Sequence, residues 1–311
     1  MPALPLDLLR CPACAGMLEG DEVLRCTGCG AEYPVLDGVP RMLDETAPGI
    51  AAKRREAEGW IEMAKAHGWY EPDDEVDAVL PYVSRELGWD DKTWRANEHS
   101  FDLMLGLLEP GMRVLEVGAA KCWGAQHVVP RGCTYVGTDI LADPLIGVGR
   151  GAFYEERVGP FLRVQADGES LPFASSAFDV AYCVATLHHA LDLGAMVREM
   201  ARVTRRGGWV VALNEGTRAL YRSGEVEDQA EEKSFGINEH VHTLHAYLWA
   251  FARAGLLVRR VEQAEGYEEL ARRRIGGRLL RLPGVGRSAA TWFTQTCYGY
   301  SGVTLLARKL R

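Results

Sequence analysis

The sequence predicts an α/β fold built on a mainly parallel sheet of seven strands with helices on both faces. The first observation is that short apolar runs alternate with helical patterns from residue 113 onward. The second is the small-residue turn Gly118–Ala120 after the first run. The third is the pair of acids, Asp139 and Asp167, that ends the next two runs. Because ligands of such folds bind beyond the carboxyl ends of the strands, we expect a site at that edge.

Seven segments have the length and apolar content of strands. They are residues 113–118, 134–140, 161–167, 178–184, 208–215, 256–263 and 302–309. Helical patterns separate most of them, notably at 190–204 and 243–255, and Gly207 and Gly255 are typical helix stops. We therefore assign residues 111–311 to one domain.

Ahead of this domain, residues 1–43 contain two Cys-x-x-Cys pairs. Cys11 and Cys14 form the first pair, and Cys26 and Cys29 form the second. Two such turns direct four thiolates toward one point, an arrangement that Zn²⁺ prefers, and four protein ligands leave no position for substrate. We expect a structural zinc ribbon, with a redox pair or an iron–sulfur cluster as the alternatives.

Residues 44–110 have apolar residues at helical spacing, with Trp60 and Trp69 among them. The pattern predicts two or three helices, which Pro110 and Gly111 end. Periodicity leaves two interpretations open, a connector packed on the main domain or a cap over its site.

The turn after the first strand disfavours dinucleotides. A dinucleotide-binding turn has the pattern Gly-x-Gly-x-x-Gly, whereas Ala120 and Trp123 occupy the second and third glycine positions here. A tryptophan prevents the close helix–strand packing that the third glycine allows. Glu116, Asp139 and Asp167 add negative charge, which repels phosphates and suits a cationic nucleoside. S-adenosylmethionine, with a sulfonium, an ammonium and no phosphate, meets these requirements.

Residues 113–215 resemble the class I S-adenosylmethionine-dependent methyltransferases of the type 11 kind, whose fold is Rossmann-like. The segments VLEVGA, VGTDI and ADGESLPFASSAFDVAYCVATLHHALDLGAMVREMARVTRRGGWVVALNE occur in the family's order and spacing. The resemblance implies a turn that contacts methionine, an acid after strand two that binds ribose, and an acid after strand three that faces adenine. The implied cofactor-binding residues are Glu116, Gly118, Ala119, Asp139, Ile140, Asp167, Gly168 and Val184. Where GAAKCW departs from the family pattern, Lys121 either reaches the methionine carboxylate or faces solvent.

Residues 6–43, LLRCPAC…CTGCGAEYPVLDGVPRML, are similar to the small zinc-ribbon proteins that partner and activate methyltransferases. The resemblance implies a mostly β module of about this length. It also implies that such a module is here fused in cis to the domain that follows.

Methyl transfer from a sulfonium requires an acceptor atom aligned with the methyl carbon, and a base helps when the acceptor is a hydroxyl or a protonated amine. The catalytic candidates at strand ends and in nearby loops are His189, Glu215 and His240. Packing at a helix start is the alternative role of His188 and His189. Residues 238–247 also carry metal-ligand atoms, but only His242 and His245 share a helix face, so that a base or surface roles are favoured there.

Charge is distributed unevenly along the chain. The net charge is −8, yet residues 253–311 hold 12 Arg or Lys and 4 Asp or Glu. The basic insertion at about 266–299 combines arginines with leucines and predicts an amphipathic helix. A solvated face on a lid is one interpretation, and contact with an acidic substrate, RNA or an anionic membrane surface is the other.

The composition limits the classes of protein to which the chain can belong. The 311 residues are 47% hydrophobic and 25% charged, as in ordinary globular proteins. No apolar run is long enough to cross a bilayer, and no secretion signal is evident, so that a cytoplasmic location is expected. The other cysteines are then expected as buried thiols: Cys122, Cys133, Cys183 and Cys297. The oligomeric state stays open.

These features predict an S-adenosylmethionine-dependent methyltransferase that acts on a small molecule, such as a biosynthetic intermediate or a sugar. Methylation of RNA, for example an rRNA base, or of protein is the alternative within the enzyme class. A non-catalytic platform that binds the cofactor and a partner is the alternative outside it. The net negative charge and the few arginines of the ribbon disfavour bulk binding to RNA.

Overall fold

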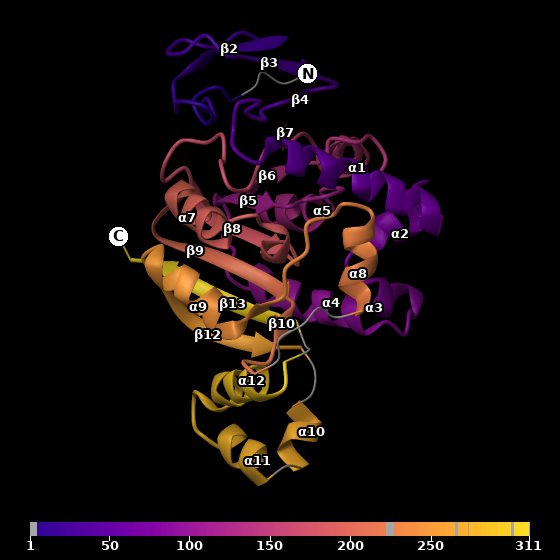
Figure 1. Ribbon diagram of the computed structural model, residues 1–311, viewed down its shortest axis with the longest axis vertical. Coiled ribbons are helices and arrows are strands. Elements are labelled where there is room, and N and C mark those ends of the chain that lie inside the picture. The colour runs from indigo at the N-terminus through magenta and orange to yellow at the C-terminus, as the bar shows by residue number, and fades with distance from the viewer. Residues whose placement is uncertain (1–4, 222–226, 265–266, 273, 300–301, 311) are drawn as a thin grey trace.

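The computed structural model describes residues 5–221, 227–264, 267–272, 274–299 and 302–310. Along its longest axis lie a small antiparallel sheet, a central α/β domain and a group of short helices at the opposite end (Figure 1). The small sheet comes from the N-terminal residues, and the short helices come from an insertion near the C-terminus.

The central sheet has seven strands in the order β12-β13-β9-β8-β5-β6-β7. They are β5 (Arg113–Val117), β6 (Thr134–Asp139), β7 (Leu162–Gln165), β8 (Phe178–Val184), β9 (Thr204–Glu215), β12 (Leu256–Gln263) and β13 (Val303–Lys309). Strands from β9 to β7 run parallel, and β13 is antiparallel to β9 and β12. The predicted, mainly parallel sheet of seven strands is confirmed. Because the chain runs outward from β5 to β7 and then returns to β8, the β5–β8 junction is a topological switch point, where such folds bind ligands.

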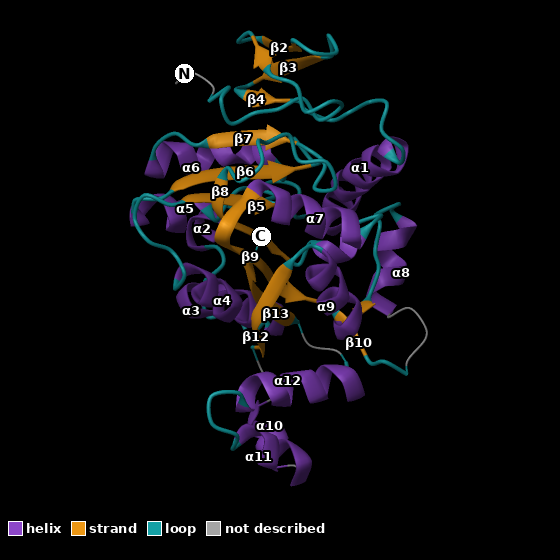
Figure 2. Ribbon diagram, turned by 90° about the vertical axis from the view of Figure 1, so that its left-hand side faces the viewer, coloured by secondary structure: helices purple, strands orange, loops and turns teal. Residues whose placement is uncertain are grey.

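Helices cover both faces of this sheet (Figure 2). On one face lie α7 (Leu193–Val203) and α9 (Leu244–Arg253), and on the other lie α4 (Lys92–Leu105), α5 (Ala125–Val128) and α6 (Gly151–Val158). The spacing of apolar residues explains this packing, because Met196, Val197 and Met200 form a buried stripe on α7. Asp192 caps that helix by accepting a hydrogen bond from the backbone N–H of Ala195, at 3.0 Å.

Four helices precede the sheet, where the sequence predicted two or three. They are α1 (Ile50–His67), α2 (Asp74–Val79), α3 (Val83–Leu87) and α4. Pro81 separates α2 from α3, because proline has no N–H to continue a helix and restricts the residue before it. Asp73 caps α2 and Asp91 caps α4 through their side-chain oxygens.

The N-terminal ribbon is a four-stranded antiparallel sheet that docks on the edge of the central sheet. Its strands are β1 (Leu18–Glu19), β2 (Val23–Cys26), β3 (Glu32–Leu36) and β4 (Val39–Pro40). The N–H of Met42 donates to the carbonyl of Gln165 in β7, at 2.8 Å. The backbone of Arg41 forms an isolated parallel β-bridge with the same residue. Leu9 and Met42 are fully buried in the hydrophobic cluster that also includes residues of the central sheet. The ribbon thus covers the edge strand β7, whose backbone groups would otherwise face solvent.

The remaining elements are added around the carboxyl end of the sheet. A small parallel pair, β10 (Thr217–Arg218) and β11 (His242–Thr243), flanks α8 (Glu227–Ser234) in the sequence. Between β12 and β13 the basic insertion folds into α10 (Tyr267–Arg272), α11 (Arg274–Leu280) and α12 (Gly286–Cys297), in place of the single amphipathic helix predicted. Among the described residues, no helix has both the length and the apolar character needed to span a membrane.

Candidate active site and cysteine cluster

A cavity of about 300 Å³ opens at the carboxyl ends of β5, β6, β7 and β8. Its volume lies at the lower end of the range for small-molecule sites. It is lined by Lys53, Glu56, Trp60, Trp69, Val117, Gly118, Ala120, Asp139, Ile140, Leu141, Ile146, Ala166, Asp167, Gly168, Val184, Ala185, Thr186, His189, Ala190 and Met196. Six of the eight predicted cofactor residues lie in this wall: Gly118, Asp139, Ile140, Asp167, Gly168 and Val184.

The turn after β5 brings backbone into the cavity wall. Gly118 has a φ of +73°, and a Cβ placed on it would lie 2.3 Å from Cγ2 of Thr186. The N–H groups of Gly118 and Ala119 both donate to the carbonyl of Thr138, at 2.8 and 2.9 Å. A glycine is therefore required here for conformation and for space.

The side chains of Glu116 and Ala119 lie behind this turn rather than in the cavity wall. Glu116 is buried in the sheet and accepts hydrogen bonds from the hydroxyls of Tyr135 and Tyr182, the latter at 2.7 Å. Burial raises the pKa of Glu116 to about 7, although the two tyrosines act to lower it. In this position Glu116 packs behind the turn and stabilises it. Ala119 is buried as well.

Asp139 joins two loops of the cavity. Its two carboxylate oxygens accept hydrogen bonds from the N–H of Leu141 and from the N–H of Ala120, each at 2.8 Å. Burial raises its pKa, and the backbone donors act in the opposite direction. Each oxygen keeps further acceptor capacity for a ligand hydroxyl, because a carboxylate has about four lone-pair sites.

A lysine from α1, which the sequence did not single out, reaches Asp167 across the cavity. Nζ of Lys53 lies 3.2 Å from Oδ1 of Asp167 and pairs with Glu169 as well. The lysine side chain is only 8% exposed; burial acts to lower its pKa, but the two carboxylates raise it overall. Lys53 therefore offsets the negative charge of the loop after β7.

Helix α1 and the residues after it form one side of the cavity. Glu56, Trp60 and Trp69 line it together with Lys53. Glu56 is 2% exposed, and burial raises its pKa to about 8, against the effect of Lys53. Residues 44–110 thus contribute part of the cavity wall. No pattern in the sequence distinguished Glu56 from the other charged residues of α1.

Lys121 takes neither of the positions considered for it. Its Nζ lies 2.9 Å from Oδ1 of Asp77, whose carboxylate is buried and also binds Arg150. The ion pair ties the turn after β5 to α2. The buried carboxylate of Asp77 explains the position of Lys121, because leaving that carboxylate without cationic partners would cost free energy of folding.

Glu215 and His188 form a buried pair beside the cavity. Nδ1 of His188 lies 2.8 Å from Oε2 of Glu215, and Oε1 accepts hydrogen bonds from the N–H groups of Thr186 and Leu187. Although burial acts to lower it, Glu215 raises the pKa of His188 to about 9. Glu215 is fully buried and does not line the cavity. Its contacts hold the loop after β8 in place.

His189 lines the cavity itself. Its Nδ1 lies 2.7 Å from the carbonyl oxygen of Asn238, and the side-chain amide of Asn238 donates back to the carbonyl of His189 at 2.6 Å. A carbonyl only accepts, so Nδ1 carries the proton. Burial, together with the charge of His188, lowers the pKa of His189 to about 3. The ring is therefore neutral, with a lone pair on Nε2.

His240 is exposed and does not line the cavity; its backbone N–H donates to the carbonyl of His188 at 2.9 Å. Within the described residues, two groups of side chains could hold a metal ion: the four ribbon cysteines, and His188, His189 and Glu239. Neither includes His242 or His245, whose rings contact Tyr247 and Trp292.

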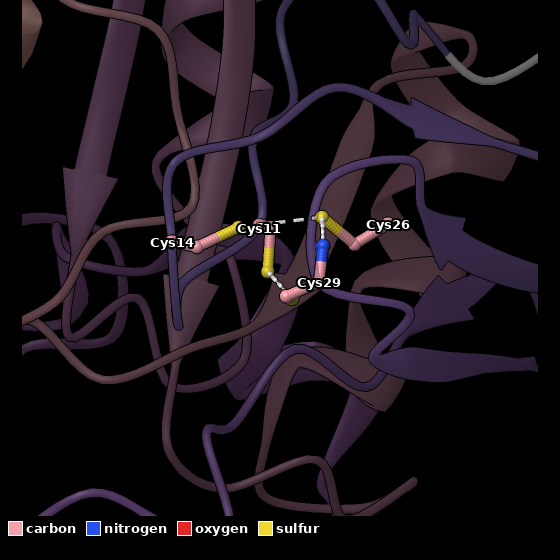
Figure 3. Close-up of side chains that lie close together, drawn as sticks. All are labelled: Cys11, Cys14, Cys26 and Cys29. Atoms are coloured by element: carbon pink, nitrogen blue, oxygen red, sulfur yellow. Dashed lines mark hydrogen bonds between the residues drawn. The ribbon is translucent and has the colours of Figure 1, made fainter.

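The four ribbon cysteines converge (Figure 3). Sγ of Cys11 and Sγ of Cys29 are 3.6 Å apart, Sγ of Cys14 and Sγ of Cys26 are 3.4 Å apart, and all four sulfurs lie within 4.8 Å of one another. Zn–S bonds of about 2.3 Å in a tetrahedron place sulfurs about 3.8 Å apart, so that the spacing fits one ion. Backbone N–H groups of Cys29 and Gly28 point at Cys26 and lower its pKa, which favours the thiolate that binds metal.

The other cysteines are free thiols, as expected. Cys122, Cys133 and Cys183 are buried, and Cys297 is half-buried. Burial raises the pKa of the first three, which keeps them protonated and inert.

The fold and the cavity define a Rossmann-like α/β protein with a cavity at the switch point of its sheet, the place where such folds bind ligands. Residues 115–212 match the family model described as a methyltransferase domain. This match confirms the expected methyltransferase domain for the part of the chain that it covers.

Two curated relatives cover parts of the chain. A demethylmenaquinone methyltransferase of Mycobacterium marinum is 33% identical over 121 residues, 39% of this chain and 47% of that protein. A ubiquinone biosynthesis O-methyltransferase of Bordetella bronchiseptica is 27% identical over 165 residues, 53% of this chain and 62% of that protein. The chain thus spans about half the length of the first of these relatives and somewhat more of the second.

Among solved structures, a geranyl diphosphate methyltransferase in complex with GPP and sinefungin superposes with a TM-score of 0.54 at 16% identity. The match covers 84% of this chain and 100% of that chain. At this identity the similarity shows the fold.

Proposed function

We propose that this protein binds S-adenosylmethionine in the cavity beyond β5, β6, β7 and β8 and transfers its methyl group to a small-molecule acceptor. The observation that carries the proposal is the wall itself, in which a glycine turn, Asp139 and the Asp167 loop meet at the switch point under α1. The methyltransferase domain match over residues 115–212 supports it.

The residues present suit this cofactor. The acceptor capacity left on Asp139 fits ribose hydroxyls, and the Gly118 turn admits a ligand close to the backbone. Trp60 and Trp69 supply aromatic faces, which attract cations. The carboxyl groups of Glu56, Asp139 and Asp167 all lie in the wall, so that a cationic ligand fits better than a diphosphate.

S-adenosylmethionine supplies a methyl group that is already activated on a sulfonium. The chain therefore has to align an acceptor and manage its proton. His189 presents a neutral ring whose protonated Nδ1 is fixed by Asn238, which leaves Nε2 to accept a hydrogen bond from the acceptor. A pKa of about 3 makes His189 a weak base. Glu56, which lies 3.7 Å from Nδ1 of His189, is the stronger base, and with a pKa of about 8 its ionised, proton-accepting fraction grows as pH rises toward 8.

A small molecule is the acceptor that the site supports best. Side chains of α1 line the cavity, and the two curated relatives are named demethylmenaquinone methyltransferase and ubiquinone biosynthesis O-methyltransferase. A quinone precursor offers a ring carbon or a hydroxyl, and a hydroxyl acceptor would use the His189–Glu56 pair.

We further propose that Cys11, Cys14, Cys26 and Cys29 hold one structural zinc ion. The sulfur spacing supports this proposal, and the four ligands leave no position for substrate. The ribbon packs its apolar side chains into the same cluster as the central sheet, so that zinc would stabilise the whole chain.

Two measurements test the function. Calorimetry should show binding of S-adenosylmethionine and of S-adenosylhomocysteine, and no binding of nicotinamide or flavin dinucleotides. Incubation with methyl-labelled S-adenosylmethionine and a fractionated bacterial extract should then label the small-molecule fraction. Label in the RNA or protein fraction would overturn the proposed acceptor class. Firm binding of a dinucleotide without binding of S-adenosylmethionine would overturn the cofactor.

A further inference from the structure

The helical insertion, which we define as residues 267–299, is strongly basic. Between residues 271 and 299 there is no Asp or Glu, whereas arginine occurs six times, at positions 272, 273, 274, 278, 281 and 287. Among the described ones, Arg274, Arg278 and Arg281 are exposed on α11 and the turn that follows it. This concentration of cations contrasts with the net charge of −8 of the whole chain.

Exposed aliphatic side chains lie among these arginines. Ile275 is 57% exposed, Leu282 45% and Val285 58%, and all three belong to α11 and the turn between α11 and α12. Singly exposed apolar residues are common, but three within eleven residues, interleaved with arginines, form a mixed basic and apolar surface. Such a surface is typical of elements that lie at a lipid–water interface.

The helical insertion stands apart from the rest of the protein. It lies at the end of the long axis opposite the ribbon (Figure 1), and α11 packs mainly on α10 and α12. It leaves the sheet after Gln263 of β12 and returns at Val303 of β13, and both residues pair at the sheet edge that also carries Glu215. That edge is the carboxyl edge, on which the cavity opens. The basic surface therefore extends from the same edge as the cavity.

We propose that the helical insertion docks the protein on the surface of an anionic phospholipid bilayer. Arg274, Arg278 and Arg281 meet the negatively charged headgroups, and Ile275 and Val285 enter the boundary between headgroups and acyl chains. The apolar residues interleaved with these arginines are aliphatic and have no flat π face on which bases stack. The exposed aromatic residue of α12, Trp292, is of a type enriched at membrane–water interfaces, so that the combination fits a lipid surface better than single-stranded RNA. The proposal concerns a surface distinct from the cavity and does not depend on methyl transfer.

Co-sedimentation of the full chain with vesicles tests the proposal. We expect binding to vesicles of equal parts phosphatidylcholine and phosphatidylglycerol, little binding to phosphatidylcholine alone, and weaker binding as salt is raised. Arg278→Gln should reduce the partition coefficient about fivefold, since one cation near an anionic surface contributes about 1 kcal/mol. Ile275→Glu should reduce it further, because a carboxylate would have to enter the interface.

Matched controls lie away from the helical insertion. Leu36→Glu changes a ribbon residue that is 52% exposed, and Arg198→Gln changes an exposed arginine of α7; neither should alter binding. Equal binding to both kinds of vesicle, or none, would overturn the proposal. So would retention of RNA that depends on Arg278 but is insensitive to Ile275→Glu, or tight binding of inorganic phosphate by calorimetry, which would indicate a site for a small anion.

Discussion

His188 and Glu215 are joined by a 2.8 Å contact between Nδ1 and Oε2, in a place where Glu215 is fully buried. Glu215 ends β9, and His188 follows β8, so that the pair connects two neighbouring strands beyond the sheet. Through its other oxygen Glu215 also accepts the N–H groups of Thr186 and Leu187. The loop that presents Thr186 and His189 to the cavity is thus held from behind.

We expect Glu215→Ala to destabilise the protein by about 3–5 kcal/mol, because it leaves a buried histidine and two backbone donors without their acceptor. Urea unfolding at neutral pH measures the change. The control is Glu45→Ala, which removes an exposed, solvent-screened ion pair with Arg54 and should change the stability far less. If the two variants lose similar stability, the buried pair does not hold the loop after β8 in place.

The same pair predicts how stability depends on pH. The folded pKa of His188 is raised to about 9, so its contribution is full below the unfolded value of about 6.5 and is lost as pH rises through 9. The pKa of Glu215 is lowered, so its contribution is lost only as pH falls below about 4.5. We therefore expect His188→Gln to flatten the fall in melting temperature between pH 6.5 and 9. An unchanged slope in that variant would contradict this assignment.

Gly118→Ala should weaken binding of S-adenosylmethionine by about tenfold or more, because the added methyl group meets Thr186 at 2.3 Å in the cavity wall. Calorimetry measures the affinity. Gly111→Ala is the matched control, since Gly111 also has a positive φ, of +88°, but nothing lies within 4 Å of its Cβ position. Both variants carry a similar backbone penalty of about 1 kcal/mol, and only the first should lose affinity. Equal affinities would place the ligand elsewhere.

The ionisation of Glu56 should make the relative affinity for two related ligands depend on pH. Its pKa of about 8 means that it is mostly neutral below pH 8 and carries a negative charge above it. S-adenosylmethionine has a sulfonium charge that S-adenosylhomocysteine lacks, so the ratio of their affinities should rise as pH passes through 8. In Glu56→Gln, which keeps the shape but cannot ionise, the ratio should stay flat. A ratio that rises equally in both proteins would assign the effect to another group.

Removal of the metal should destabilise more than the ribbon. Elemental analysis should give about one zinc per chain, and Cys26→Ser or a strong chelator should lower the melting temperature by several degrees. The physical reason is that Leu9 and Met42 are buried in a cluster shared with the central sheet. Cys297→Ser, at a half-buried position away from the ribbon, is the control and should keep its zinc. A chain without zinc, or one whose stability a chelator leaves unchanged, would argue against a structural ion.

Local patterns of apolar and turn residues in the sequence predicted much of the fold. Apolar runs bounded by turns predicted all seven central strands. In inner parallel strands such as β5 and β8, burial on both faces explains the nearly continuous apolar segment. The strand predicted at 208–215 begins earlier, at Thr204, since the polar residues Arg205 and Arg206 extend it beyond the apolar run. The Cys pairs were also predictable from the sequence, because the spacing of each Cys-x-x-Cys turn directs two sulfurs toward one point.

The sequence by itself therefore determined the order of the strands along the chain, the cysteine pairs, and the acids at the ends of β6 and β7. Only the tertiary structure decided that Lys53 of α1 pairs with Asp167 and that Glu56 lines the same cavity. It also decided that Lys121 pairs with Asp77, and that Glu215 holds His188 instead of lining the cavity. The reason is physical. Periodicity along the chain reports which face of an element is apolar, whereas the partner of a buried charge depends on which distant elements pack together.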